Sequence, residues 1–264
     1  MAAIGVALVA IAMAAGCGST NDAENVGAST RQLTVDVVES YRHDRTRFTQ
    51  GLEIADGVLY EGTGLRGRSR LIATEFSGSG PGEVRASVDL DSDLFGEGLT
   101  VVGDRLWQLT WTEEMAIERD RAGLTERRRV SYSGEGWGLC FDGQRLVMSD
   151  GSAQLTFRDR QTFEPLGSIT VRNASGEPVE RLNELECVEG AVLANVWQTD
   201  TIVRIDPASG RIRAQIDASG LLTREQQRDA DVLNGIAAIP GTDEFLITGK
   251  NWPLMFRVRF VSRP

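Results

Sequence analysis

Five residues able to take part in chemistry stand at one equivalent position of a short cassette that occurs five times along the chain. The cassette is a hydrophobic run followed by a turn, and its copies begin with Gln50, Glu97, Trp137, Asn183 and Asn234. A glutamate can take up and return protons, and amide side chains can donate hydrogen bonds to a carbonyl oxygen. Copies of one cassette arranged around an axis would bring these five unlike side chains to a single pocket.

A second set of residues lies where the next strand of each cassette is expected to end. Counting four residues from an aligned leucine gives Thr63, Thr110, Asp150, Trp197 and Lys250. Side chains at even spacing share one face of a strand, so we expect Trp197 and Lys250 to face the same pocket as the first set. Lys250 is also the only lysine among 28 basic residues.

Tryptophans gather near these strand ends. Four of the five in the chain fall there: Trp111, Trp137, Trp197 and Trp252. Packing between the repeats would account for one or two of them. Four together predict an aromatic-walled pocket, in which stacking and a low dielectric constant strengthen polar contacts.

The cassettes recur at intervals of 40 to 51 residues, a period typical of β-propeller blades. In each copy an inner strand is followed by a tight turn that contains glycine, such as Asp56-Gly57, and then by a second strand. Residues Leu33–Tyr41 alternate and are rich in valine, which predicts a strand that pairs with Phe256–Val261 and completes the last blade. We therefore predict an all-β, five-bladed β-propeller over residues 33–264.

One segment, Leu221–Asp231, does not follow the repeat. Thr223 and Gln226 are three residues apart in it, which is the spacing of a capping box at the start of a helix. We expect a short helix inserted between the fourth and fifth cassettes, where it would decorate the surface.

The N-terminal segment predicts export. Residues 1–16 are apolar and small, and the stretch is too short to span a bilayer, so it is typical of a signal peptide. Ala15-Gly16-Cys17 resembles a bacterial lipobox, in which Cys17 would carry the lipid, and residues 17–32 read as a flexible polar tether. The alternative is an ordinary cleaved signal with an incidental cysteine. In both cases the protein works outside the cytoplasm, as a cell-envelope lipoprotein or a secreted protein.

Charge and composition narrow the function further. A net charge of −10 argues against electrostatic binding of nucleic acid or an anionic lipid surface. His43 is the only histidine, and the three cysteines (Cys17, Cys140 and Cys187) are widely spaced, so a catalytic zinc site of the usual His/Cys type is not predicted. Whether Cys140 and Cys187 form a disulfide stays open at this point.

Several ordered motifs resemble those of one enzyme family. They are FTQGL (48–52), YEGTGLRG (60–67), FGEGLT (95–100), LNELE (182–186), ANVWQTD (194–200), LNGIA (233–237) and TGKNWP (248–253). Together they resemble the plant and bacterial type of glutaminyl-peptide cyclotransferase, or glutaminyl cyclase. The resemblance extends from about Leu33 to Phe260, over all five cassettes.

The resemblance implies a five-bladed propeller, without the zinc of the animal enzyme, that converts N-terminal glutamine of peptides and proteins to pyroglutamate with release of ammonia. It implies Glu97 as the acid/base residue, with Lys250 and Asn183 assisting. Substrate-binding residues would be Phe48, Gln50, Phe95, Trp111, Trp137 and Trp197. We expect a monomer without a cofactor, leaving open a structural calcium ion and the role of Glu61.

Two other functions compete with this interpretation. A lactonase-like propeller could bind calcium through the oxygens of Glu97, Asn183 and Asn234. Trp137 at an equivalent position, and the absence of an aspartate there, argue against it. A propeller could also bind a ligand or protein without catalysis, although such a module has no need for a lone carboxylate among tryptophans.

Overall fold

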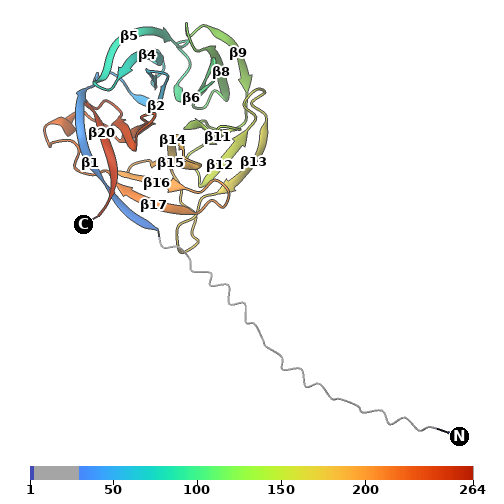
Figure 1. Cartoon of the computed structure of the whole chain (residues 1–264). Coiled ribbons are helices and arrows are strands. Elements are labelled where there is room, and N and C mark those ends of the chain that lie inside the picture. Colours follow the sequence, from blue (N-terminus) through green and yellow to red (C-terminus); the bar gives the residue numbers. More distant parts are fainter. Residues whose placement is uncertain (3–29, 264) are drawn as a thin grey trace.

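The computed structural model describes residues 1–2 and 30–263. Within this part the chain is all β apart from one 3-10 helix, η1 (Gln226–Arg228). Three four-stranded sheets and one eight-stranded sheet surround a common centre, as the blades of a propeller do (Figure 1). No helix of the described residues is long and apolar enough to cross a membrane. The predicted signal peptide from residue 3 on, Cys17 and most of the tether lie outside the described residues.

Each four-stranded sheet is an antiparallel meander of consecutive strands. The first consists of β2 (Thr49–Ala55), β3 (Val58–Thr63), β4 (Arg70–Ser77) and β5 (Gly80–Asp89). The second consists of β6 (Gly96–Val102), β7 (Arg105–Thr110), β8 (Met115–Asp120) and β9 (Glu126–Ser131). The third consists of β10 (Leu139–Phe141), β11 (Leu146–Ser149), β12 (Gln154–Arg158) and β13 (Pro165–Thr170).

The eight-stranded sheet combines the fourth and fifth cassettes with both ends of the folded chain. Its order is β14-β15-β16-β17-β1-β20-β19-β18, formed by β14 (Leu182–Val188), β15 (Ala191–Val196), β16 (Thr201–Ile205), β17 (Ile212–Asp217), β18 (Leu233–Ala238), β19 (Glu244–Gly249), β20 (Leu254–Ser262) and β1 (Arg31–Arg42). The predicted pairing of the terminal strands is confirmed, since β1 runs antiparallel to β20 from Leu33 to Arg42. β1 begins at Arg31, and its first residues also pair parallel with β17, which joins the two halves.

The first strands of the five cassettes form the centre. β2, β6, β10, β14 and β18 contact one another in a closed ring, and the outer strands β5, β9, β13 and β17 lie at the periphery (Figure 1). Glycine permits this close approach. A Cβ atom on Gly98 would lie 2.7 Å from the Trp137 carbonyl oxygen, and one on Gly138 would lie 2.1 Å from that of Asn183. The second and third cassettes therefore need glycine after their first residue, because neighbouring backbones touch there.

In the fourth cassette this glycine position is occupied by Glu184. Its carboxylate is buried and accepts hydrogen bonds from the backbone N–H groups of Leu52 (3.1 Å) and Ile236 (2.9 Å). These two donors belong to β2 and β18, so the side chain of Glu184 links three inner strands. Burial raises its pKa well above 4.5, although the two backbone hydrogen bonds act in the opposite direction.

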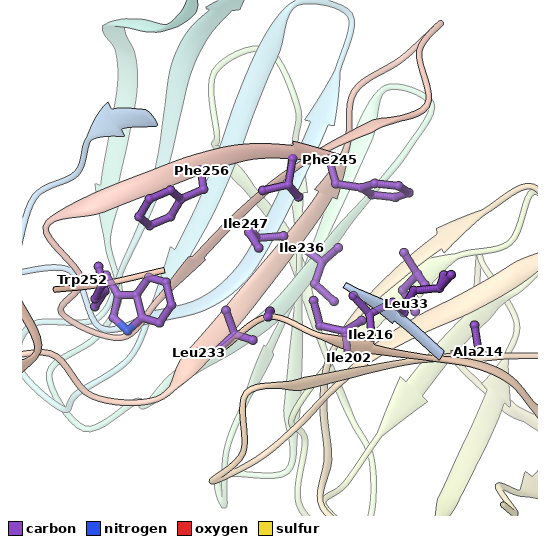
Figure 2. Close-up of a cluster of buried hydrophobic side chains, with 14 residues drawn as sticks. Leu33, Ile202, Ala214, Ile216, Leu233, Ile236, Phe245, Ile247, Trp252 and Phe256 are labelled. Carbon is purple, nitrogen blue, oxygen red and sulfur yellow. The ribbon is translucent and has the colours of Figure 1, made fainter. Parts of the chain in front are cut away.

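Trp252 lies in the hydrophobic core, not in the pocket wall predicted from its position. It is 4% exposed and packs edge-on against Phe256 with ring centroids 6.2 Å apart, within a cluster between the fourth and fifth cassettes that also contains Leu233 (Figure 2). Its indole N–H donates to the Asp231 carbonyl oxygen at 2.8 Å. The local chain turns the ring toward this cluster, where an indole buries a large apolar area.

The predicted helix at Leu221–Asp231 is wrong in extent. Only η1 forms, although the capping-box contacts are present: the Thr223 N–H donates to Gln226 Oε1 (2.9 Å) and the Gln226 N–H to Thr223 Oγ1 (3.3 Å). None of the residues of η1 is buried. Without an apolar face to pack, the first turn is not extended into an α-helix.

A disulfide bond joins Cys140 of β10 to Cys187 of β14, with their Cα atoms 5.4 Å apart. It links the inner strands of the third and fourth cassettes. The pairing of Cys140 with Cys187, which the sequence left open, is therefore present in the structure. The bond closes a separation of 47 residues, and cross-linking a loop of that length stabilises the folded chain by about 4 kcal/mol through loss of unfolded-state entropy.

Candidate active site

One cavity of about 470 Å³ lies where the inner strands begin and the second strands end. All nine predicted catalytic and substrate-binding residues line it: Phe48, Gln50, Phe95, Glu97, Trp111, Trp137, Asn183, Trp197 and Lys250. They come from all five cassettes. A site assembled in this way depends on closure of the whole ring, because each cassette supplies only one to three of its walls.

Irregular strand pairing occurs at the first residues of four of the five cassettes. The register between first and second strands shifts at Thr49/Gly51, Gly96/Leu99, Leu182/Leu185 and Leu233/Ile236. Each shift spans the cassette's first residue, and Trp137 of the remaining cassette precedes its strand. A bulge releases a residue from the regular ladder and re-aims its side chain, and three of these four residues, Gln50, Glu97 and Asn183, line the cavity.

Glu97 is the buried carboxylate of the cavity. It is 4% exposed, and its Oε1 accepts a hydrogen bond of 2.9 Å from Gln50 Nε2. The Gln50 Oε1 in turn accepts from Asn234 Nδ2 at 3.1 Å. Asn234 is fully buried behind Gln50 and does not line the cavity, contrary to the simplest expectation from the repeat. It fixes the orientation of the Gln50 amide, which donates to Glu97.

The surroundings of Glu97 favour its protonated form more than the surroundings of an exposed glutamate would. Burial raises its pKa well above 4.5, and this is the largest cause of the shift. The positive charge of Lys250 acts against the shift, whereas the carboxylates of Glu113 and Glu135 add to it. A carboxyl whose pKa moves toward neutrality is suited to both proton uptake and proton return.

Lys250 follows β19 and is 6% exposed. Its backbone N–H donates to the Val232 carbonyl oxygen (3.0 Å), and its own carbonyl oxygen accepts from the Asp231 N–H (2.8 Å). The Nζ atom lies 4.9 Å from the centroid of the Phe48 ring, a cation–π distance. Burial lowers the pKa of Lys250, and the charges of Glu97 and Asp231 oppose this shift.

Aromatic rings form the remaining walls in edge-to-face contact. Ring centroids are 6.1 Å apart for Phe48 and Phe95, 5.5 Å for Phe95 and Trp111, and 5.4 Å for Trp137 and Trp197. Interplanar angles of 61° to 89° are the favoured arrangement for such pairs. The walls therefore fix one another and leave a slot of defined shape.

Three residues of the second set do not reach the cavity. Thr63 Oγ1 donates to the Arg70 carbonyl oxygen (3.3 Å) and Thr110 Oγ1 to that of Met115 (2.8 Å), while Asp150 Oδ1 accepts from the Ser152 N–H (3.0 Å). Short polar side chains at strand ends satisfy local backbone groups in this way. Only the longer Trp197 and Lys250 extend into the cavity, as predicted.

Four lining residues were not predicted from the sequence: Leu65, Gln198, Asp231 and Val232. All lie on loops, where no strand periodicity marks them. Leu65 has a φ of 83° and Gln198 one of 63°, a conformation that side chains other than glycine rarely adopt and that occurs often at functional sites. This backbone geometry, which a sequence does not display, marks Leu65 and Gln198, whereas no comparable signal marks Asp231 or Val232.

Glu61, whose role the sequence left open, lies in a separate buried network. Its Oε1 faces His43 Nε2 (2.8 Å) and accepts from Thr49 Oγ1 (2.7 Å), and its Oε2 accepts from Arg47 Nη1 (2.6 Å). The His43 Nδ1 lies 2.9 Å from the Trp252 carbonyl oxygen. Both ring nitrogens thus lie within hydrogen-bond distance of an oxygen that can accept.

The residues of the alternative calcium site are not all brought together. Glu97 and Asn183 line the cavity, but the amide of Asn234 donates to the Thr49 carbonyl oxygen (3.0 Å) and to Gln50. In the part of the chain that the structure describes, no group of three or more His, Cys, Asp and Glu residues is placed to hold a metal ion.

Known proteins resemble this chain in sequence and in fold. The sequence model of the family described as glutamine cyclotransferase matches residues 7–260. A curated protein of Arabidopsis thaliana, named glutaminyl-peptide cyclotransferase, is 37% identical over 236 residues, which are 88% of this chain and 72% of that protein. The crystal structure of Myxococcus xanthus glutaminyl cyclase superimposes with a TM-score of 0.79 at 37% identity, covering 89% of this chain and all of that one.

The chain therefore belongs to the glutamine cyclotransferase family. The resemblance stated from the sequence motifs is confirmed by the family match and by both relatives.

Proposed function

We propose that this protein cyclises the N-terminal glutamine of peptides or proteins to pyroglutamate, with release of ammonia, in the cavity around Glu97. The observation that carries the proposal is the buried carboxylate of Glu97, which opens into an aromatic slot with a single side-chain hydrogen bond. The names of the two relatives, glutaminyl-peptide cyclotransferase and glutaminyl cyclase, support the same reaction.

Glu97 is proposed to move the proton of the reaction. The neutral α-amine of the substrate attacks its own γ-carboxamide carbon, which forms the C–N bond of a five-membered lactam. Ionised Glu97 takes a proton from the attacking amine and returns it to the leaving NH₂ group, so that the original amide C–N bond breaks and ammonia departs. One carboxyl therefore acts as base and then as acid, and it ends the cycle ionised.

The neighbouring groups are proposed to stabilise charge and hold the substrate. The ammonium of Lys250 and the amide of Asn183 both border the cavity and can donate hydrogen bonds to the carbonyl oxygen as negative charge develops. Gln50 keeps the Glu97 carboxylate oriented. The tryptophan and phenylalanine walls hold the glutamine side chain folded back on its own amine, which raises the effective concentration of the nucleophile.

We further propose that the architecture is a five-bladed propeller attached to a membrane through Cys17. The closed ring of five inner strands supports a count in which the eight-stranded sheet forms two blades. The lipobox-like Ala15-Gly16-Cys17 supports the anchor. Replacing Cys17 with serine should release the protein from the membrane fraction. Wild-type protein that is already soluble and carries no lipid by mass spectrometry would contradict the anchor.

The reaction is tested by incubating purified protein with a dipeptide that begins with glutamine and measuring ammonia and the cyclised product. The same dipeptide with an acetylated amine is the matched control, because it retains the carboxamide but has no nucleophile. We expect ammonia only from the free amine, with and without a metal chelator. Ammonia from the acetylated peptide would indicate simple amide hydrolysis, and loss of activity with chelator would favour a metal enzyme.

A further inference from the structure

Two of the tryptophan walls share one hydrogen-bond acceptor. The Oε2 atom of Glu135 accepts from Trp111 Nε1 at 2.7 Å and from Trp137 Nε1 at 2.9 Å. Trp111 follows β7 and Trp137 precedes β10, so one oxygen connects walls that belong to different sheets. Glu135 itself is exposed, and both indoles that it contacts line the cavity.

The loop that carries Glu135 is held from both sides. The Gly134 N–H donates to Glu114 Oε1 (2.9 Å), and the Gly136 N–H donates to the Trp111 carbonyl oxygen (2.9 Å). A Cβ atom on Gly136 would lie 2.1 Å from Tyr132 Oη, so this backbone passes where no side chain fits. The carboxylate is therefore presented from a fixed backbone in spite of its exposure.

The orientation of these two rings reaches the rest of the cavity wall. Trp111 packs against Phe95, and Trp137 packs edge-on against Trp197. Charge-assisted hydrogen bonds to a carboxylate are about twice as strong as neutral ones, so they set the ring planes more firmly than packing does at an open edge. Glu135 also places a negative charge close enough to Glu97 to raise the pKa of that carboxyl.

We propose that Glu135 is a positioning residue of this site, which orients Trp111 and Trp137 through one carboxylate oxygen. The inference rests on the proposed function. Glu135 does not touch the reacting atoms. It acts through the two indoles that confine the glutamine side chain.

Three variants separate the hydrogen bonds of Glu135 from its charge. Glu135→Gln keeps an acceptor oxygen but removes the charge, and Glu135→Ala removes both. The matched control is Glu113→Gln, because Glu113 also raises the pKa of Glu97 but bonds to Arg66 and the Phe95 N–H, not to an indole.

We expect Glu135→Ala to lower kcat/KM by about tenfold to a hundredfold, as for a slightly misplaced substrate. Glu135→Gln should retain most of the kcat/KM that Glu135→Ala loses. In both Gln variants the acidic limb of the kcat/KM profile should move to lower pH, because loss of a nearby negative charge lowers the pKa of Glu97. The near-UV circular dichroism should change in Glu135→Ala alone.

The spectroscopic measurement keeps this inference separate from the proposed function. If wild-type protein releases no ammonia, the proposed function fails, while the spectra still decide whether Glu135 orients the indoles. Acrylamide quenching of Glu135→Ala, referenced to Trp111→Phe and Trp137→Phe variants, should show more accessible indoles. Unchanged spectra and quenching in Glu135→Ala would overturn the positioning role.

Discussion

Two buried glutamates in neighbouring sheets behave in opposite ways. Glu97 and Glu61 are 4% and 1% exposed, so water is nearly excluded from both. Glu97 accepts one side-chain hydrogen bond, from a neutral amide, and its pKa is raised. Burial alone would also raise the pKa of Glu61, but His43, Arg47 and Thr49 together lower it to about 2. Because both carboxyls are buried, the number and charge of their hydrogen-bond donors decide which of them can exchange a proton.

The two glutamates also differ in role, since Glu61 holds segments of the chain together and Glu97 faces the cavity. The Glu61 network ties the chain before β2 to the end of the last cassette. His43 bonds to the Trp252 carbonyl oxygen, and the backbone carbonyl oxygen of Arg47 accepts from the Asn251 N–H at 2.8 Å. These segments carry Phe48 and Lys250. A carboxylate with hydrogen-bond donors on both oxygens thus holds the two ends of the ring together, while one with a single side-chain donor faces the cavity.

The largest expected effect is on catalysis at Glu97. Glu97→Gln keeps the size of the side chain but removes the base, so ammonia release should fall by roughly 10²- to 10⁴-fold. The melting temperature should stay level or rise, because an uncompensated buried carboxyl is lost. Near-wild-type cyclisation by this variant would remove Glu97 from the mechanism.

Glu61→Gln should act on stability in place of catalysis. Removing one partner of a buried ionic network leaves the others uncompensated, and we expect a loss of about 3–5 kcal/mol in the free energy of unfolding. Glu75→Gln is the matched control, because Glu75 pairs with Arg85 at an exposed site where a loss below about 1 kcal/mol is expected. Denaturant titration measures both. Equal losses would show that burial of the Glu61 network is unimportant.

Lys250→Met tests the cationic side of the cavity. The substitution keeps the length of the side chain and its apolar contact with Phe48 but removes the donor, so turnover should fall by about 10² with the melting temperature unchanged. Arg45→Met, which removes an exposed positive charge, is the control and should retain activity. Unchanged turnover in Lys250→Met would place this lysine outside the reaction.

The smallest effect is a difference in how stability depends on pH. Since the pKa of Glu61 is lowered to about 2, its contribution is present above the unfolded value of 4.5 and is lost as the pH falls toward 2. Since the pKa of Glu97 is raised, its protonated form favours folding, and stability is lost as the pH rises above 4.5. Each group changes the free energy of unfolding by at most about 1.4 kcal/mol per pH unit.

Unfolding curves at several pH values check both signs. The difference between wild type and Glu61→Gln should shrink toward pH 2, whereas Glu97→Gln should gain on wild type as the pH rises. A parallel offset of either variant at all pH values would mean that its carboxyl does not change its proton affinity on folding.

Residue patterns were sufficient for the part of the site that follows the repeat. The cassettes placed Gln50, Glu97, Trp137 and Asn183 at strand starts, and the motif resemblance added the aromatic residues of the cavity. The repeat pattern did not predict the contacts of a side chain that can bond either to a neighbouring residue or to a ligand in the cavity. Asn234 occupies the same position in its cassette, yet it bonds to Gln50 instead of facing the cavity, and no feature of its own segment marks that difference.

The sequence by itself determined the repeat, the glycines that let inner strands touch, and the single carboxylate placed among aromatic residues. Only the tertiary structure decided that Trp252 enters the core, that Cys140 meets Cys187, and which partners Glu61 and Glu135 receive. The physical reason is the separation along the chain over which each interaction acts. Strand periodicity and turn chemistry act over a few residues, whereas hydrogen bonds such as that between His43 and Trp252, 209 residues apart, exist only after the ring has closed.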